Sequence, residues 1–161
     1  MGLDATVFCD CYEKGKLRAQ PPPGTVLRVE ADGSLSTTGK QEALEAALAF
    51  DEWQAGFACE HPNGVLLHHR LGNISLIGLL RSELRREPLR FPILLGKVVY
   101  SGTHGGDYIS AELAPELQKE IEALADFKCS TKEADDFMSR FRTQMLDLVV
   151  ASRSVNKPIA F

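Results

Sequence analysis

The sequence lacks an excess of basic residues, a long apolar run and any Cys-x-x-Cys pair. Its 161 residues include 18 Lys plus Arg against 22 Asp plus Glu, so no net positive charge attracts it to the phosphates of nucleic acid. No window approaches the ~18 consecutive apolar residues that a membrane helix needs. We therefore expect neither nucleic acid nor a membrane as a partner.

Signals for export and for known enzyme chemistry are also lacking. The start, MGLDATVFCDC, has no basic segment followed by an apolar one, as a secretory signal would have. The four cysteines do not have the spacing of a disulfide framework, so we expect reduced thiols and a cytoplasmic location. A nucleophile elbow, an HExxH motif, a phosphate-binding GKS or GKT and a G-x-G-x-x-G fingerprint are all missing.

The β-like patterns lie mainly near the start of the chain. Residues 6–12 alternate in polarity, which predicts a strand. Segments 25–30 and 34–36 flank Asp32-Gly33, and Asp-Gly supplies the positive φ of a hairpin turn. The apolar tail from Pro158 to Phe161 is expected to dock as a short extended segment beside these strands. We favour an extended conformation for VLLHHRL, residues 65–71.

The rest of the chain has the spacing of helices. We expect one to begin at Thr38 with Gln41 in a capping box, and another to begin after Asn73 as N-cap. Further helices are predicted over 91–99, over 111–127 with Ser110 as cap, and from a Ser130–Glu133 capping box to Asn156. The predicted fold is α+β, a helix-dominated single domain over residues 1–161 with a small antiparallel sheet formed by the first ~36 residues.

Three cysteines and one histidine form two closely spaced pairs. Cys9, Cys11, Cys59 and His61 would supply a Cys₃His zinc set if the first strand packs beside the end of the first long helix. Paired structural zinc ligands usually have two to four residues between them, however, whereas each pair here has one, and a buried cysteine often serves as a small apolar residue. We therefore expect metal-free thiols and no cofactor, and keep these four residues as the alternative ligand set.

A second polar group combines histidines with arginines. His68, His69 and Arg70 are followed by Arg81 and Arg85, which share a helix face and could grip a carboxylate or phosphate. Glutamates interleave with these arginines, as they do on a solvated helix surface. A small anionic ligand is therefore the secondary interpretation of this group.

The loop YSGTHGGDY, residues 100–108, gathers glycines around two titratable side chains. Gly102, Gly105 and Gly106 could expose backbone amides to an oxyanion, while Asp107 could orient the imidazole of His104 for catalysis. The alternative is a glycine cap on the preceding helix, with a histidine that satisfies the helix end.

Several stretches resemble a group of small uncharacterised bacterial proteins. They are LLHHRLGNISLIGLLRSEL, VVYSGTHGGDY, the ending KPIAF and the MGLD start. The resemblance implies a bacterial, cytosolic origin and transfers no activity or site residue.

Two classes of function follow from the sequence. The first is a protein-interaction domain, immunity-like or antitoxin-like, whose acidic balance suits a basic protein partner. The second is a small enzyme or anion-binding protein that uses the loop around His104 with His68, His69 and an arginine. Convergence of these side chains on one pocket would favour the second class. The sequence leaves the oligomeric state open.

Overall fold

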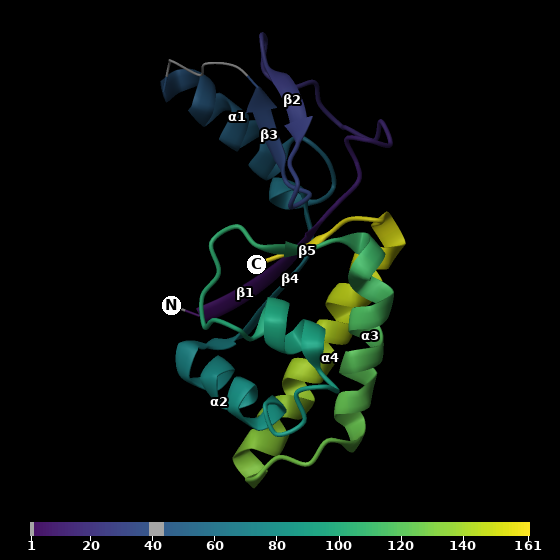
Figure 1. The fold of residues 1–161 in the computed structure, drawn as a ribbon. Coiled ribbons are helices and arrows are strands. Elements are labelled where there is room, and N and C mark those ends of the chain that lie inside the picture. Colours follow the sequence, from purple (N-terminus) through teal and green to yellow (C-terminus); the bar gives the residue numbers. More distant parts are fainter. Residues whose placement is uncertain (1, 39–43) are drawn as a thin grey trace.

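Two separate clusters of buried apolar side chains organise the chain. The computed structural model describes residues 2–38 and 44–161. In Figure 1, β2, β3 and α1 form an upper part, here the hairpin lobe (residues 10–38 and 44–64), and the other elements form the main lobe. Helices hold 48% and strands 18% of the residues, so the expected helix-rich α+β domain is confirmed.

The main lobe contains a four-stranded antiparallel sheet. Its strands are β1 (Gly2–Phe8), β4 (Val65–Asn73), β5 (Tyr108–Ile109) and β6 (Ile159–Ala160), in the order β4-β1-β6-β5. Alternation along β1 buries Leu3, Ala5 and Val7, as the pleat of a strand requires. The extended conformation of β4 and the docking of the C-terminal tail are both confirmed.

The hairpin forms its own two-stranded sheet. Strands β2 (Val26–Val29) and β3 (Leu35–Thr38) pair only with each other among the described residues. Gly33 has a φ of +89°, as the turn needs. The prediction of one sheet within the first part of the chain is therefore wrong in extent: β1 pairs with distant β4 and β6 instead, because these strands complete the core of the main lobe.

Helix α1 (Leu44–Gly56) covers the hairpin. Phe50 and Trp53 are buried against the other residues of the hairpin lobe. The Trp53 indole N–H donates a hydrogen bond to the carbonyl of Ala19. The capping box predicted at Thr38 stays a prediction, because Thr38 is the last residue of β3 and Gln41 lies outside the described residues.

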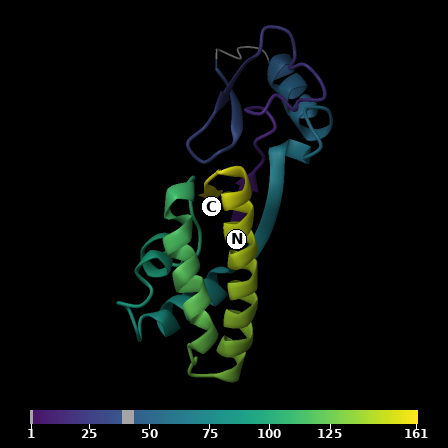
Figure 2. The same cartoon turned by 90° about the vertical axis from the view of Figure 1, so that its right-hand side faces the viewer.

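The helices of the main lobe follow the predicted order. They are α2 (Ile74–Leu84), the short π-helical η2 (Leu94–Val98), α3 (Ala114–Ala123), which lies between the 3₁₀ turns η3 (Ala111–Leu113) and η4 (Leu124–Asp126), and α4 (Lys132–Val155). Asn73 caps α2 through Leu76 N–H, as predicted. Ser110 makes no side-chain cap, which corrects that prediction. α2 and α4 pack against β1 and β4, and α3 runs along α4 (Figure 2).

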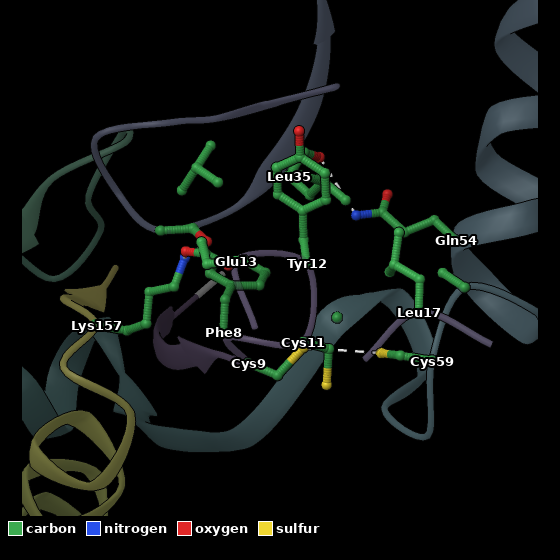
Figure 3. Close-up of a pocket in the computed structure, with 14 residues that line it drawn as sticks. Phe8, Cys9, Cys11, Tyr12, Glu13, Leu17, Leu35, Gln54, Cys59 and Lys157 are labelled. Carbon is green, nitrogen blue, oxygen red and sulfur yellow. Dashed lines mark hydrogen bonds and ion pairs between the residues drawn. The ribbon is translucent and has the colours of Figure 1, made fainter. Parts of the chain in front are cut away.

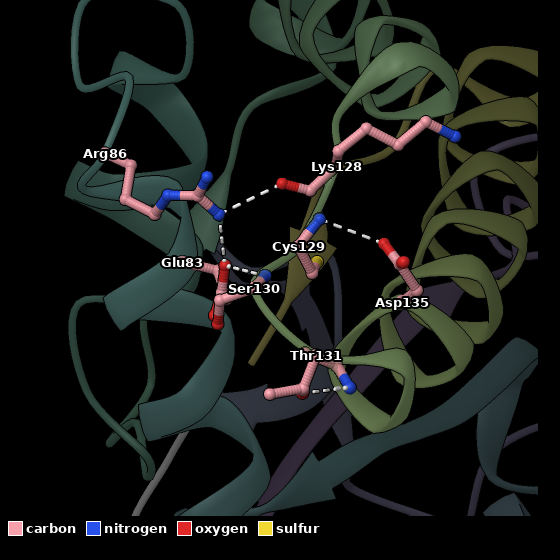
Figure 4. Close-up of polar contacts among 8 residues, drawn as sticks. Glu83, Arg86, Lys128, Cys129, Ser130, Thr131 and Asp135 are labelled. Atoms are coloured by element: carbon pink, nitrogen blue, oxygen red, sulfur yellow. Dashed lines mark hydrogen bonds and ion pairs between the residues drawn. The ribbon is translucent and has the colours of Figure 1, made fainter.

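A buried glutamate joins the end of α2 to the start of α4 (Figure 4). Glu83 accepts hydrogen bonds from the Ser130 backbone N–H and hydroxyl and from Arg86. The hydrogen bond from the Ser130 hydroxyl lowers the pKa of Glu83 below its usual value. Burial raises this pKa and Arg86 lowers it further. The predicted cap at Ser130 is therefore wrong by one residue: Ser130 is engaged by Glu83, and Thr131 caps α4 through Ala134 N–H.

Within residues 2–38 and 44–161, no helix combines the length and apolar character needed to cross a membrane.

Candidate metal centre

Three thiols and one imidazole meet where the chain passes between the two lobes. The first passage, just after β1, carries Cys9 and Cys11, and the second, between α1 and β4, carries Cys59 and His61. The four potential ligand atoms all lie within 4.8 Å of one another. The end of the first strand therefore lies beside the end of the first long helix, which is the packing that a Cys₃His zinc set requires.

Two of the six ligand-to-ligand distances match the edges of a zinc tetrahedron. Zinc lies ~2.3 Å from sulfur and ~2.0–2.1 Å from nitrogen, so tetrahedral geometry places two sulfurs about 3.8 Å apart and sulfur and nitrogen about 3.5 Å apart. Cys9 Sγ and Cys59 Sγ are 3.8 Å apart. Cys11 Sγ and His61 Nδ1 are 3.4 Å apart. Each of these two edges joins one ligand from each passage, so a bound ion would tie the passages together.

Tight turns aim backbone amides at the sulfurs. His61 N–H donates to Cys59 Sγ at 3.4 Å, and the backbone N–H of Cys11 bonds to Cys9 in the same way. Such bonds favour the thiolate form that binds metal. The two passages are themselves joined by a hydrogen bond from Cys9 N–H to the Gly64 carbonyl at 2.8 Å.

Burial disfavours the charged form of the Cys9 and Cys11 thiols when they lack a cation. It raises the pKa of the Cys11 thiol to about 12, and the neighbouring Cys9 and Cys59 add to this shift. Burial also raises the pKa of Cys9, against the lowering effect of the Cys11 N–H. A divalent cation supplies the charge that stabilises several adjacent thiolates in one place.

A small apolar cavity lies beside the cysteines (Figure 3). Its volume is about 30 Å³, and Phe8, Leu17 and Leu35 contribute to its lining together with the three cysteines. This is room for one or two water molecules, whereas ligand sites usually measure hundreds of Å³. The four-donor set with this cavity fits a closed structural centre better than a substrate site.

A buried ion pair lies at the same junction. The Lys157 ammonium, 6% exposed, pairs with Glu13 of the hairpin lobe and lies 3.4 Å from the Gly33 carbonyl. Figure 3 shows Lys157 and Glu13 on one side of the cavity and Cys59 on the other. The C-terminal segment thus holds the hairpin lobe at a second point.

The loop at 100–108 has the structural features of a connector. The His104 side chain is fully buried, its Nε2–H donates to the Val98 carbonyl at 2.8 Å, and its ring packs on Tyr100 and Phe161. Asp107 accepts from the Tyr100 hydroxyl, and its Oδ2 lies 3.2 Å from His104 Nδ1. His104 therefore satisfies the end of the η2 segment, which is the structural alternative considered for this loop.

The path of the backbone favours glycine at two of the three loop positions, Gly102 and Gly106. A side chain at Gly102 would meet Ile74 Cγ2 at 2.9 Å, and Gly106 has a φ of +85°, while Gly105 has open space around it. A surface hollow of about 210 Å³ nearby is lined by Asp107 but not by His104.

The histidines of β4 lie far from this loop. His68 on β4 pairs with Thr6 on β1, Thr6 pairs with Ala160 on β6, and Ala160 pairs with Tyr108 on β5. These pairings cross the sheet from one edge strand to the other. Three strand spacings place His68 and Tyr108 about 14 Å apart. His68 Nδ1 contacts the Thr6 hydroxyl, and His69 contacts Asp147 of α4. His104 and Asp107 therefore do not converge with His68 or His69.

The three arginines proposed for an anion have different surroundings, and Arg81 contacts the 100–108 loop itself. Arg81 donates to the Tyr100 carbonyl, Arg85 is exposed at the end of α2, and Arg70 is exposed on β4. Arg81 thus has a structural partner, and no described contact joins Arg70 to Arg81 or Arg85.

No family model, curated protein or solved structure matches this chain. The resemblance to small bacterial proteins therefore stays a prediction.

Sequence reasoning named the four junction residues but gave them little weight. The one-residue spacing within each pair departs from the usual ligand pattern. The useful signal was the recurrence of that spacing, Cys9-x-Cys11 and Cys59-x-His61, with a Pro-Asn-Gly turn directly after the second pair. Only the packing of the two passages reveals that they form one site.

Proposed function

We propose that this protein binds one zinc ion through Cys9, Cys11, Cys59 and His61, and that the ion has a structural role. The observation that carries the proposal is the agreement of the 3.8 Å and 3.4 Å cross-passage distances with tetrahedral zinc edges. Zinc rather than a hard cation is favoured because all four donors are sulfur or imidazole nitrogen. This replaces the metal-free interpretation as the better-supported one.

The metal content of the purified protein tests this proposal. We expect about one zinc per chain by elemental analysis after purification without added metal, and the visible spectrum of a tetrahedral thiolate complex after cobalt substitution. Cys11→Ser should weaken zinc binding by more than the ~10–100-fold typical of changes to residues that only hydrogen-bond a metal ligand. Cys129→Ser is the matched control, because this half-buried thiol lies outside the ligand set. Absence of stoichiometric zinc, or an unchanged cobalt spectrum in Cys11→Ser, would contradict the proposal.

The interaction function proposed from the sequence is supported by the outer face of α1. Leu44 and Leu48 are 75% and 57% exposed, one helical turn apart. Glu45, Asp51 and Glu52 are exposed on the same helix, which contains no basic residue. Exposed leucines on a helix whose charged residues, over Leu44–Gly56, are all acidic complement a basic amphipathic helix of a partner protein. We propose that partner class for this face.

A synthetic helical peptide of leucine and lysine is a direct probe of this face. We expect binding that weakens as salt increases, with chemical-shift changes confined to α1, and at least a ~10-fold loss of affinity in Leu48→Lys from repulsion and lost apolar contact. Leu89→Lys is the control, because Leu89 is 96% exposed on the main lobe. Equal binding by the two variants would overturn this second proposal.

A further inference from the structure

We propose that Cys9 and Cys59 form a reversible disulfide site, oxidised by hydroperoxides, whose formation expels the zinc ion. This inference rests on the proposed zinc site and adds a regulatory chemistry to it. The two residues lie 50 positions apart in sequence, so the bond would join the two passages that the ion joins in the reduced protein.

The geometry favours this pair. The two Sγ atoms are 3.8 Å apart, so a closing movement of less than 2 Å brings them to the ~2.05 Å of a disulfide. Cys9 is partly exposed, whereas Cys11 and Cys59 are buried. A peroxide arriving from solvent therefore meets Cys9 first, and Cys59 is in position to resolve the product.

The chemistry balances with hydrogen peroxide as the oxidant. The Cys9 thiolate attacks one peroxide oxygen, the O–O bond breaks, and the sulfur becomes a sulfenic acid as the first water leaves after protonation. The Cys59 thiolate then attacks that sulfur and displaces the second water, again with one proton taken up. The two sulfurs lose two electrons in total, which reduce the peroxide to two waters.

Oxidation removes two of the four proposed ligands at once. Cys11 and His61 remain, and two donors do not complete the coordination that structural zinc requires. The ion therefore leaves, while the new S–S bond keeps the passages joined.

Peroxide treatment of the zinc-loaded protein tests the inference. We expect release of about one zinc per chain, measured with a colorimetric chelator, together with a Cys9–Cys59 link found by peptide mapping without reductant. Dithiothreitol followed by added zinc should reverse both changes. Cys129→Ser should behave as the wild type. Cys9→Ser and Cys59→Ser should yield no link between the passages through these two positions. Metal-free Cys11→Ser should still form the Cys9–Cys59 link.

The outcomes separate this inference from the zinc proposal. A protein that never binds zinc yet forms the Cys9–Cys59 disulfide would refute the zinc proposal and the expulsion of the ion, and would leave the disulfide site supported. A zinc-loaded protein that retains its metal in peroxide, or in which Cys11 forms the link instead, would overturn the disulfide site while leaving zinc binding intact.

Discussion

Removal of the proposed zinc ion is expected to unfold the hairpin lobe while the main lobe keeps its structure. The hairpin lobe has a small apolar cluster of Phe50, Trp53 and Ala58, and its two strands have four residues each. An isolated hairpin of this size is marginal in water, whereas structural zinc contributes an apparent ~10–16 kcal/mol in small zinc-dependent domains. The main lobe has its own large cluster, which includes Phe91, Phe141 and Met145.

Tryptophan fluorescence and hydrogen exchange measure this effect separately in each lobe. Trp53 is the only tryptophan of the chain and lies in the hairpin lobe, so its emission should shift to longer wavelength when a chelator removes the ion. Amides of α1 should lose protection, and those of α4 should keep it. Chelator-treated Cys129→Ser serves as the control for thiol effects. Unchanged emission and α1 protection after proven loss of zinc would show that the ion does not stabilise this lobe.

His104→Ala is expected to destabilise the protein by about 2–4 kcal/mol, because it removes a buried ring and leaves the Val98 carbonyl without its donor. A loss of this size lowers the melting temperature by several degrees or more. Thr103→Ala, at an exposed neighbouring position, should change stability by less than ~0.5 kcal/mol. Thermal unfolding followed by circular dichroism compares the two variants.

The opposite outcome would revive the catalytic interpretation of the loop. If His104→Ala kept the wild-type melting temperature, its buried hydrogen bond would contribute little, and a role in binding or turnover would regain support.

Local patterns in the sequence were sufficient for most individual elements. The Asp-Gly turn of the hairpin and the Asn73 cap depend on neighbouring residues, and both were predicted. The strand predicted over residues 6–12 is wrong in its bounds, because β1 spans Gly2–Phe8 and shares only residues 6–8 with it. Strand β5 was missed because its two residues, Tyr108 and Ile109, form a strand only by pairing with the distant β6.

Long-range contacts explain the remaining errors. Ser130 fits a capping box by local spacing, but Glu83, 47 positions away, engages it and shifts the cap to Thr131. The same limit applied to the site. Each pair of ligands was visible in the sequence, yet its weight depended on whether β1 and the end of α1 come together, which no local pattern specifies.

The Lys157–Glu13 ion pair gives the junction a mechanical property. Figure 3 shows Cys59 on one side of the cavity and this ion pair on the other, so a zinc ion bound as proposed would join the lobes at a second, separate point. With both the zinc ion and the ion pair in place, the hairpin lobe could rotate relative to the main lobe only about the line that joins these two contacts. If either contact is lost, the hairpin lobe could rotate in any direction about the remaining contact. Many more orientations would then be available to α1.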